Sequence, residues 1–163
     1  MGRFKETSRE GVKETQEKGR KGIETGNDMN QKAENIKSIL DGISLQDEDD
    51  TKAVRDTGHS YQENFNSAFS ERVESVGNEV EQKTENIKGT VNSELGNVRT
   101  GISSLERASG VSDIGRQAAE TGRASLEKSA GEYERIINDA ESVKSETVQQ
   151  IQSQKSKISS IFG

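Results

Sequence analysis

Apolar and small side chains recur at steps of three and four residues along the middle of the chain, from Val54 to Leu105. The mean step is about 3.6 residues, the period at which side chains return to one face of an α-helix. No alternating pattern of the kind that marks a strand competes with it. The positions on this face are Val54, Gly58, Tyr61, Phe65, Phe69, Val73, Val76, Val80, Thr84, Ile87, Val91, Leu95, Val98, Ile102 and Leu105. The chain must therefore place one long helix against other helices.

The longer repeat within this face is eleven residues. Two series show it, Val54, Phe65, Val76, Ile87 and Val98, and Phe69, Val80, Val91 and Ile102. Eleven residues make three turns at about 3.67 residues each, so a flat or slightly right-handed arrangement is favoured over a leucine zipper. The pattern predicts hendecad-like packing.

Proline, which breaks helices, is absent from all 163 residues, although about eight would be usual in a chain of this length. Two stretches interrupt the periodic pattern, Gly42–Asp50 and Ser109–Asp113, and we expect Asp49 or Asp50 to cap the second helix. The expected helices span about 3–43, 50–107 and 112–160. Short connections make successive helices antiparallel. The predicted fold class is all-α, an elongated antiparallel bundle of three long helices forming a single domain over 1–163.

Apolar material is scarce. Ile, Leu, Val and Phe together supply 31 of the 163 residues, near the level below which many chains cannot fold alone. A large α/β enzyme is therefore excluded, and the bundle should be marginally stable. Residues 1–25 have few apolar side chains, so we expect this segment to fray or to fold on something else.

We expect the main packing residues to lie on the central stripe, which we define as Phe65, Phe69, Val73, Val76, Val80, Ile87, Val91, Leu95, Val98 and Ile102. The other side of that contact could be this chain, a second copy or a different helical protein. Two glycines on the apolar faces, Gly58 in the middle helix and Gly122 in the last, would either allow a helix to approach closely or simply soften the helices. A twelve-residue stretch, Gly26–Lys37, recurs as Gly77–Lys88 with eight identities.

Sites for chemistry are hard to find. Cysteine is absent and His59 is the single histidine, so a thiolate zinc site and a paired-histidine metal site are excluded. The acidic run 47–50 lacks the glycine and final glutamate of a calcium loop, and no phosphate-binding glycine motif occurs. We expect no enzyme activity, no catalytic residue, no cofactor and no bound metal.

Charge and hydropathy limit the partners and the location. The sequence pI is about 5.0 with mixed charges, which argues against nucleic acid, and a membrane-surface role is a minority alternative. No apolar run is long enough to span a bilayer, and residues 1–20 lack the apolar region of a signal peptide. We expect a cytoplasmic protein, or one exported without a cleaved signal peptide.

The tripeptide Leu40-Asp41-Gly42, at the first expected turn between long helices, matches an L-x-G motif. With the absence of cysteine and of a signal peptide, it makes the chain resemble the small helical WXG/LXG proteins of bacterial type VII secretion. No W-x-G is present, and neither Tyr61 nor Tyr133 starts a Tyr-x-x-x-Asp/Glu export signal. The resemblance implies a non-catalytic secretion substrate, or a helical partner that accompanies a toxin during export.

Eleven-residue periodicity and high polarity also resemble late-embryogenesis-abundant and apolipoprotein-like chains. That resemblance implies a protective or lipid-surface protein, unfolded in water and helical on drying or on lipid. Phe65 and Phe69 are bulkier than the Ala/Thr face usual in such chains, which favours a defined fold.

Overall fold

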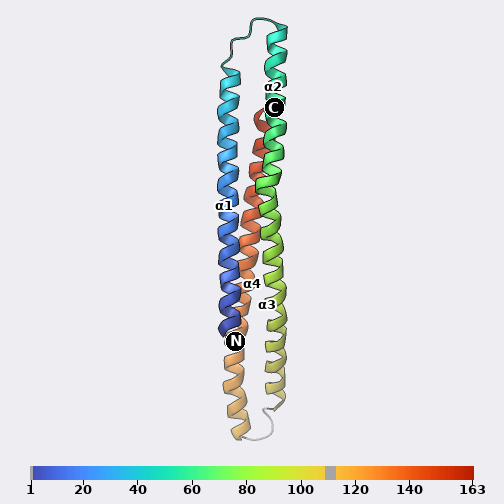
Figure 1. The fold of residues 1–163 in the computed structure, drawn as a ribbon. Coiled ribbons are helices and arrows are strands. Elements are labelled where there is room, and N and C mark those ends of the chain that lie inside the picture. The colour runs from blue at the N-terminus through green and yellow to red at the C-terminus, as the bar shows by residue number, and fades with distance from the viewer. Residues whose placement is uncertain (1, 109–112) are drawn as a thin grey trace. The chain divides into compact units, whose positions relative to one another are not determined.

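The computed structural model describes residues 2–108 and 113–163, and nearly all of them are helical (Figure 1). The helices are α1 (Gly2–Asp41), α2 (Glu48–Phe69), a π-helical segment η1 (Ser70–Glu74), α3 (Ser75–Ala108) and α4 (Asp113–Ile161). Because α2, η1 and α3 follow one another without a break, they correspond to the single middle helix expected over 50–107. The all-α helical-bundle prediction is confirmed, and the described residues contain no strand.

The first break lies where the sequence indicated, but its cap is different. The Gly42 amide donates to the Ser38 carbonyl at 3.1 Å after α1 ends. The N-cap of α2 is Asp47, whose extended backbone (φ −151°, ψ 179°) lets its carboxylate accept from the Asp50 amide at 2.9 Å. The prediction of Asp49 or Asp50 as the N-cap is therefore wrong. Those residues already lie in the first helical turn, where their negative charge interacts favourably with the positive end of the helix dipole. The second expected break, 109–112, lies outside the described residues.

The π-helical segment η1 was not expected. Its wider turn is closed by the Ser75 amide, which donates to the Ser70 carbonyl five residues back. Phe69, just before it, and Val73, within it, are both buried. A single wide turn of this kind leaves the apolar spacing almost unchanged, so periodicity alone does not reveal it.

The described chain divides into two compact units, and each is built from segments of three helices. Unit 1 comprises Met1–Thr15 and Gln82–Lys144. Its α3 and α4 segments run antiparallel, because Lys88 pairs with Glu141 and Arg99 with Glu134. The buried apolar residues of this unit are Val12, Val91, Leu95, Val98, Ala119, Tyr133, Ile136, Ala140 and Val143.

The N-terminal segment of unit 1, expected to fray, is helical from Gly2. Phe4 meets Tyr133 edge to face, with ring centroids 5.8 Å apart. Lys5 pairs with Glu132 at 2.8 Å, and Val12 is buried. A few contacts with α4 thus hold a segment that has little apolar surface of its own.

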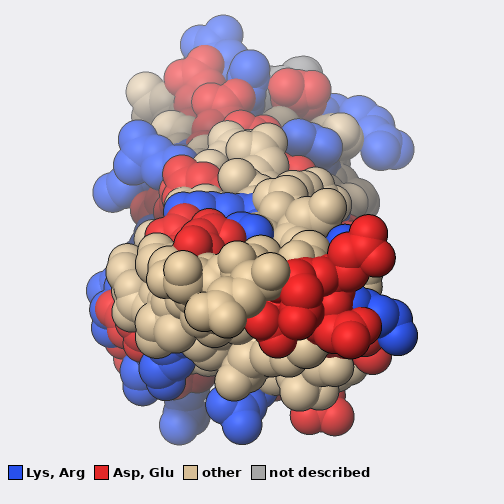
Figure 2. Space-filling model, turned by 90° about the horizontal axis from the view of Figure 1, so that it is seen from above, with Lys and Arg blue, Asp and Glu red and all other residues tan. Residues whose placement is uncertain are grey.

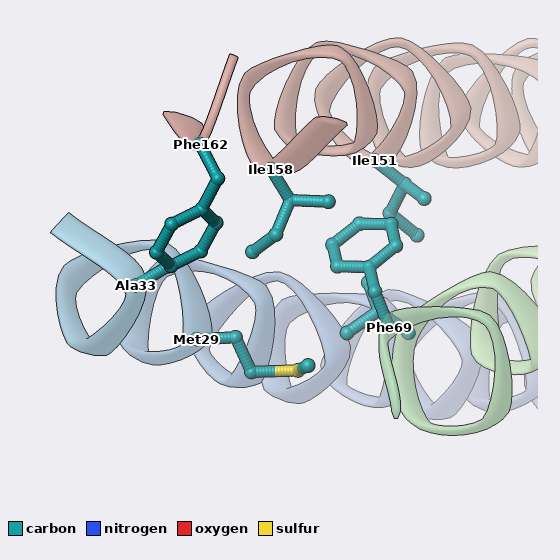
Figure 3. Packing of buried hydrophobic residues seen from close by; sticks show 7 residues of the cluster. Met29, Ala33, Phe69, Ile151, Ile158 and Phe162 are labelled. Atoms are coloured by element: carbon teal, nitrogen blue, oxygen red, sulfur yellow. The ribbon is translucent and has the colours of Figure 1, made fainter. Parts of the chain in front are cut away.

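Unit 2 comprises Gln16–Glu81 and Ser145–Gly163. Its main core cluster draws side chains from α1, α2, η1 and α4, and Figure 3 shows several of them converging between the helices. The cluster is Met29, Ala33, Phe69, Val73, Ile151, Ile158 and Phe162. This is where the apolar face of the middle helix meets the C-terminal end of the chain.

Burial repeats every eleven residues, as hendecad packing requires. The buried series are Phe69, Val80 and Val91; Val73, Thr84 and Leu95; and Ser129, Ala140, Ile151 and Phe162. In α4 the buried residues include Ala119 and Ile136, whereas the neighbouring Ala118 is exposed and Ile137 is partly buried. Polar core residues such as Ser129 interrupt the apolar pattern there and hide its phase.

The internal repeat places equivalent residues in equivalent positions. Met29 and Val80 are both buried, as are Ala33 and Thr84. The two copies thus turn the same helix face inward, which gives the repeat a packing role.

Of the two glycines expected to allow close helix approach, Gly122 does so and Gly58 does not. At Gly58 a methyl group would meet only ordinary contacts, 3.8 Å from Leu40 and 3.9 Å from Phe162, whereas at Gly122 it would lie 3.1 Å from Leu105. The tighter sites include Gly22, where it would lie 2.7 Å from Cγ1 of Val76. Valine is short and stiff, so this contact cannot relax by moving a flexible side-chain end.

We predict opposite effects for the same substitution at two helical glycines. Gly22→Ala should destabilise the protein by about 1–2 kcal/mol, because the added methyl overpacks against Val76. Gly131→Ala should stabilise it by about 0.5–1 kcal/mol, since Gly131 is exposed with no atom within 4 Å. Urea denaturation measures both, and adding Val76→Ala to Gly22→Ala should recover part of the loss. A stabilising Gly22→Ala would contradict the close approach.

A four-charge cluster in unit 1 makes stability depend on pH. Glu85 accepts from Lys144 at 2.7 Å, and Glu141 accepts from Lys88. These hydrogen bonds and the nearby ammonium charges lower the pKa of both carboxyls below 4.5. The folded state therefore holds these protons less tightly than the unfolded state does, so the stability that the pairs contribute is lost as pH falls below about 4.5.

We accordingly expect the melting temperature to fall between pH 6 and pH 3.5. The double variant Glu85→Gln/Glu141→Gln should show a smaller fall, measured by circular dichroism at low salt. If the melting temperature of the variant depends on pH in the same way as that of the unmodified chain, these ion pairs are too well solvated to contribute to stability.

Candidate interaction surface

The central stripe packs inside the chain. Six of its residues are buried, namely Phe69, Val73, Val80, Val91, Leu95 and Val98, and four are partly buried, namely Phe65, Val76, Ile87 and Ile102. None of the ten is exposed. The stripe therefore supplies the core of the two units, and a surface for another molecule has to be sought elsewhere.

Large exposed apolar side chains gather at one place in the described chain. They are Ile39 (68% exposed), Ile43 (45%), Leu45 (46%) and Tyr61 (37%), all in unit 2. Three of them flank or lie within the connection between α1 and α2. Scattered exposed apolar residues are normal, but a local concentration marks an interaction site. We refer to residues 36–58 as the α1–α2 end.

The α1–α2 end is exposed because α4 stops short of it, as Figure 1 shows at the point marked C. Helix α4 ends at Ile161. The ring of the next residue, Phe162, stacks on the rings of Tyr61 and Phe65, with centroid separations of 6.2 Å and 6.1 Å. A Cβ atom at Gly58 of α2 would lie 3.9 Å from that ring. The ten residues between Glu48 and Gly58 span roughly 15 Å of helix, and α1, which ends at Asp41, accompanies only the part of this stretch nearest Gly58.

The apolar side chains of this end continue from the core of unit 2 to its surface. Ile36 and Leu40 are partly buried and pack against the core cluster, whereas Ile39 and Ile43 project into solvent. Figure 2, which looks onto this end, shows uncharged surface beside a group of acidic side chains. The apolar surface is thus an extension of the core and has an acidic border.

The acidic border consists of Asp47, Glu48, Asp49 and Asp50. Two nearby lysines are already paired within their own helices, Lys37 with Asp41 at 3.1 Å and Lys52 with Asp56 at 4.0 Å. Among the described residues, the carboxylates of Glu48, Asp49 and Asp50 have no basic partner. With Arg55 included, residues 36–58 hold three basic and six acidic side chains, so the α1–α2 end carries a net negative charge.

A polar cavity of about 440 Å³ in unit 2 is a second candidate. It is lined by Asn27, Asn30, Gln31, Glu34, Gln150, Ser153, Gln154 and Lys157. The Gln154 amide donates to the Ile23 carbonyl at 2.7 Å and to Asn27 Oδ1 at 3.0 Å. Buried Oδ1 of Asn30 and Oε1 of Gln154 accept no hydrogen bond from the described protein, a deficit that ordered water commonly meets.

The lining of this cavity suits a structural role better than a reaction. Its charged residues, Glu34 and Lys157, pair with each other at 3.1 Å, and the amides are neither nucleophiles nor bases. Buried polar residues such as Asn30 and Gln154 can fix the register of one helix on another. We assign the cavity to the packing of α4 on α1.

Residues considered for chemistry do not form a site. His59 is exposed on α2. Among the described residues, no group of three or more acidic or histidine side chains could hold a metal ion. The described helices also include none that is both long and apolar enough to cross a bilayer.

Comparison of the chain with protein-family models, with curated proteins and with solved structures gives no match. The argument for function therefore depends on the surface of the molecule. The apolar α1–α2 end was not recognised in the sequence. Its only sequence signal is the occurrence of Ile43 and Leu45 in a connection otherwise made of polar residues and glycine.

Proposed function

We propose that this chain is a non-catalytic helical interaction protein that contacts another protein through its α1–α2 end. One observation carries the proposal: three of the four large exposed apolar side chains of the described chain, Ile39, Ile43 and Leu45, lie at this end. Leaving such side chains in water costs roughly 25 cal/mol for each Å² of apolar surface. A partner that covers them recovers that free energy.

The more specific form of the proposal concerns export. The resemblance to the WXG/LXG proteins would make the chain a type VII secretion substrate, or the helical partner of an exported toxin. The tripeptide that supports it, Leu40-Asp41-Gly42, ends α1 at the proposed contact surface. Appearance of the untagged protein in the culture medium, dependent on an intact secretion system, would support export, and strict retention in the cytoplasm would contradict it.

A photo-crosslinking amino acid tests the interaction. It is introduced at Ile39 in the cells that produce the protein, and at Ala124, an exposed α4 residue of unit 1, as a control. We expect position 39 to give a discrete adduct containing a second protein, identified by mass spectrometry. The adduct should disappear when Ile43 and Leu45 are changed to serine. No adduct, or equal adducts from both positions, would contradict the proposed function.

A further inference from the structure

We propose that the α1–α2 end binds a basic amphipathic helix of another protein. The inference rests on the proposed function and adds the chemical class of the partner. It follows from three features of this end: the missing third helix, the uncompensated acidic border and the commitment of the chain's own basic segment elsewhere.

The missing third helix indicates a helical partner. Up to Phe162, α4 covers the faces of α1 and α2, and the three helices share one core cluster. Beyond Phe162, α2 continues for roughly 15 Å to Glu48, accompanied only by the last residues of α1 and by the connection 42–47. Val54 is only partly buried there, and Ile43 and Leu45 in the connection are exposed. A helix of two to three turns would meet this apolar surface in the way that α4 meets the rest of unit 2.

The charge indicates that the partner helix is basic. Glu48, Asp49 and Asp50 border the apolar side chains and have no basic partner among the described residues. A helix carrying Lys or Arg beside its apolar stripe would compensate them, whereas an acidic helix would be repelled. The same repulsion disfavours an anionic membrane surface.

The chain itself is a poor source of that helix. Two copies meeting through their α1–α2 ends would bring the acidic borders together. The N-terminal segment, residues 1–22, is basic, with seven Lys and Arg side chains against four Glu. In a second copy this segment is already engaged, because Phe4 packs on Tyr133 and Val12 is buried within unit 1. The occupant is therefore a helix from a different protein.

Three fluorescent 18-residue peptides test the partner class against the full-length chain. Two share an apolar stripe of Leu and Ile, one flanked by Lys and the other by Glu, and the third is a scrambled form of the Lys peptide. Fluorescence anisotropy should show binding of the Lys-flanked helix at least tenfold tighter than either other peptide. Its affinity should fall as salt rises, since exposed charges are screened.

Matched variants locate the binding. Ile39→Ser/Leu45→Ser should weaken the Lys-flanked peptide at least tenfold. Glu48→Gln/Asp49→Asn/Asp50→Asn leaves the Asp47 cap in place and should weaken binding and flatten the salt dependence. The control Glu6→Gln/Glu10→Gln/Glu14→Gln removes the same charge from exposed α1 positions of unit 1 and should change little. Circular dichroism verifies that each variant is folded.

Several results would overturn the inference. The inference is wrong if the Glu-flanked helix or the scrambled peptide binds as tightly as the Lys-flanked helix. It is also wrong if the unit 1 control variant weakens binding as much as the α1–α2 variants do. Self-association lost in Ile39→Ser/Leu45→Ser, without peptide binding, would assign the surface to a second copy instead. A specific adduct from position 39 without binding of the Lys-flanked helix would leave the proposed function standing and refute only the basic partner.

Discussion

Phe69→Asp is expected to abolish cooperative unfolding of unit 2. Phe69 is 1% exposed and lies in the core cluster with Met29, Ile151 and Ile158. Truncating a buried Phe alone costs about 3–5 kcal/mol, and an unpaired carboxylate placed there adds a further penalty. The sum is comparable to the whole stability of a typical domain, about 5–15 kcal/mol.

The measurement is a far-UV circular dichroism melt in plain buffer. The matched control is Ser67→Asp, which places the same charge two residues away at an exposed position and should leave the transition nearly unchanged. An unaltered melt for Phe69→Asp would mean that Phe69 faces solvent and that the packing phase is wrong.

A melt of the unmodified chain in the same experiment distinguishes a folded helical bundle from a protective or lipid-surface protein. A defined core predicts high helicity lost in a cooperative transition. Helicity that is weak and declines gradually, and that rises only with lipid or on drying, would instead favour the late-embryogenesis-abundant or apolipoprotein-like alternative.

Tyr133→Ala is expected to have the second largest effect, in unit 1. Tyr133 is 1% exposed, its ring meets Phe4, and Lys5 Nζ lies 5.4 Å from its centroid. Removing the ring should cost about 3–5 kcal/mol. It should also release the N-terminal segment, because that segment has few other apolar contacts.

Hydrogen exchange reads out this release. In Tyr133→Ala the amides of residues 4–15 should exchange much faster than in the unmodified chain, whereas Tyr133→Phe, which keeps the ring, should retain most of their protection. Rapid exchange of 4–15 already in the unmodified chain would support the sequence-based expectation that this segment frays.

Much of the helical architecture could be predicted because its signals are local. The spacing of the central stripe and the absence of proline indicated long helices, and the break at Gly42 separated the first two. The positions of Asp47 and η1 were not predicted. Neighbouring carboxylates offer several possible caps, and one wide turn barely changes the apolar spacing.

The sequence by itself determined that the chain is helical, where the first turn lies and which face of the middle helix is buried, because periodicity and turn residues act within a few turns of helix. Only the tertiary structure decided that Gly22 meets Val76 closely, that Tyr133 holds the N-terminal segment, and that Ile39, Ile43 and Leu45 remain exposed. These features depend on how far one helix extends along another. That register results from side-chain packing between segments far apart in sequence, which no local pattern records.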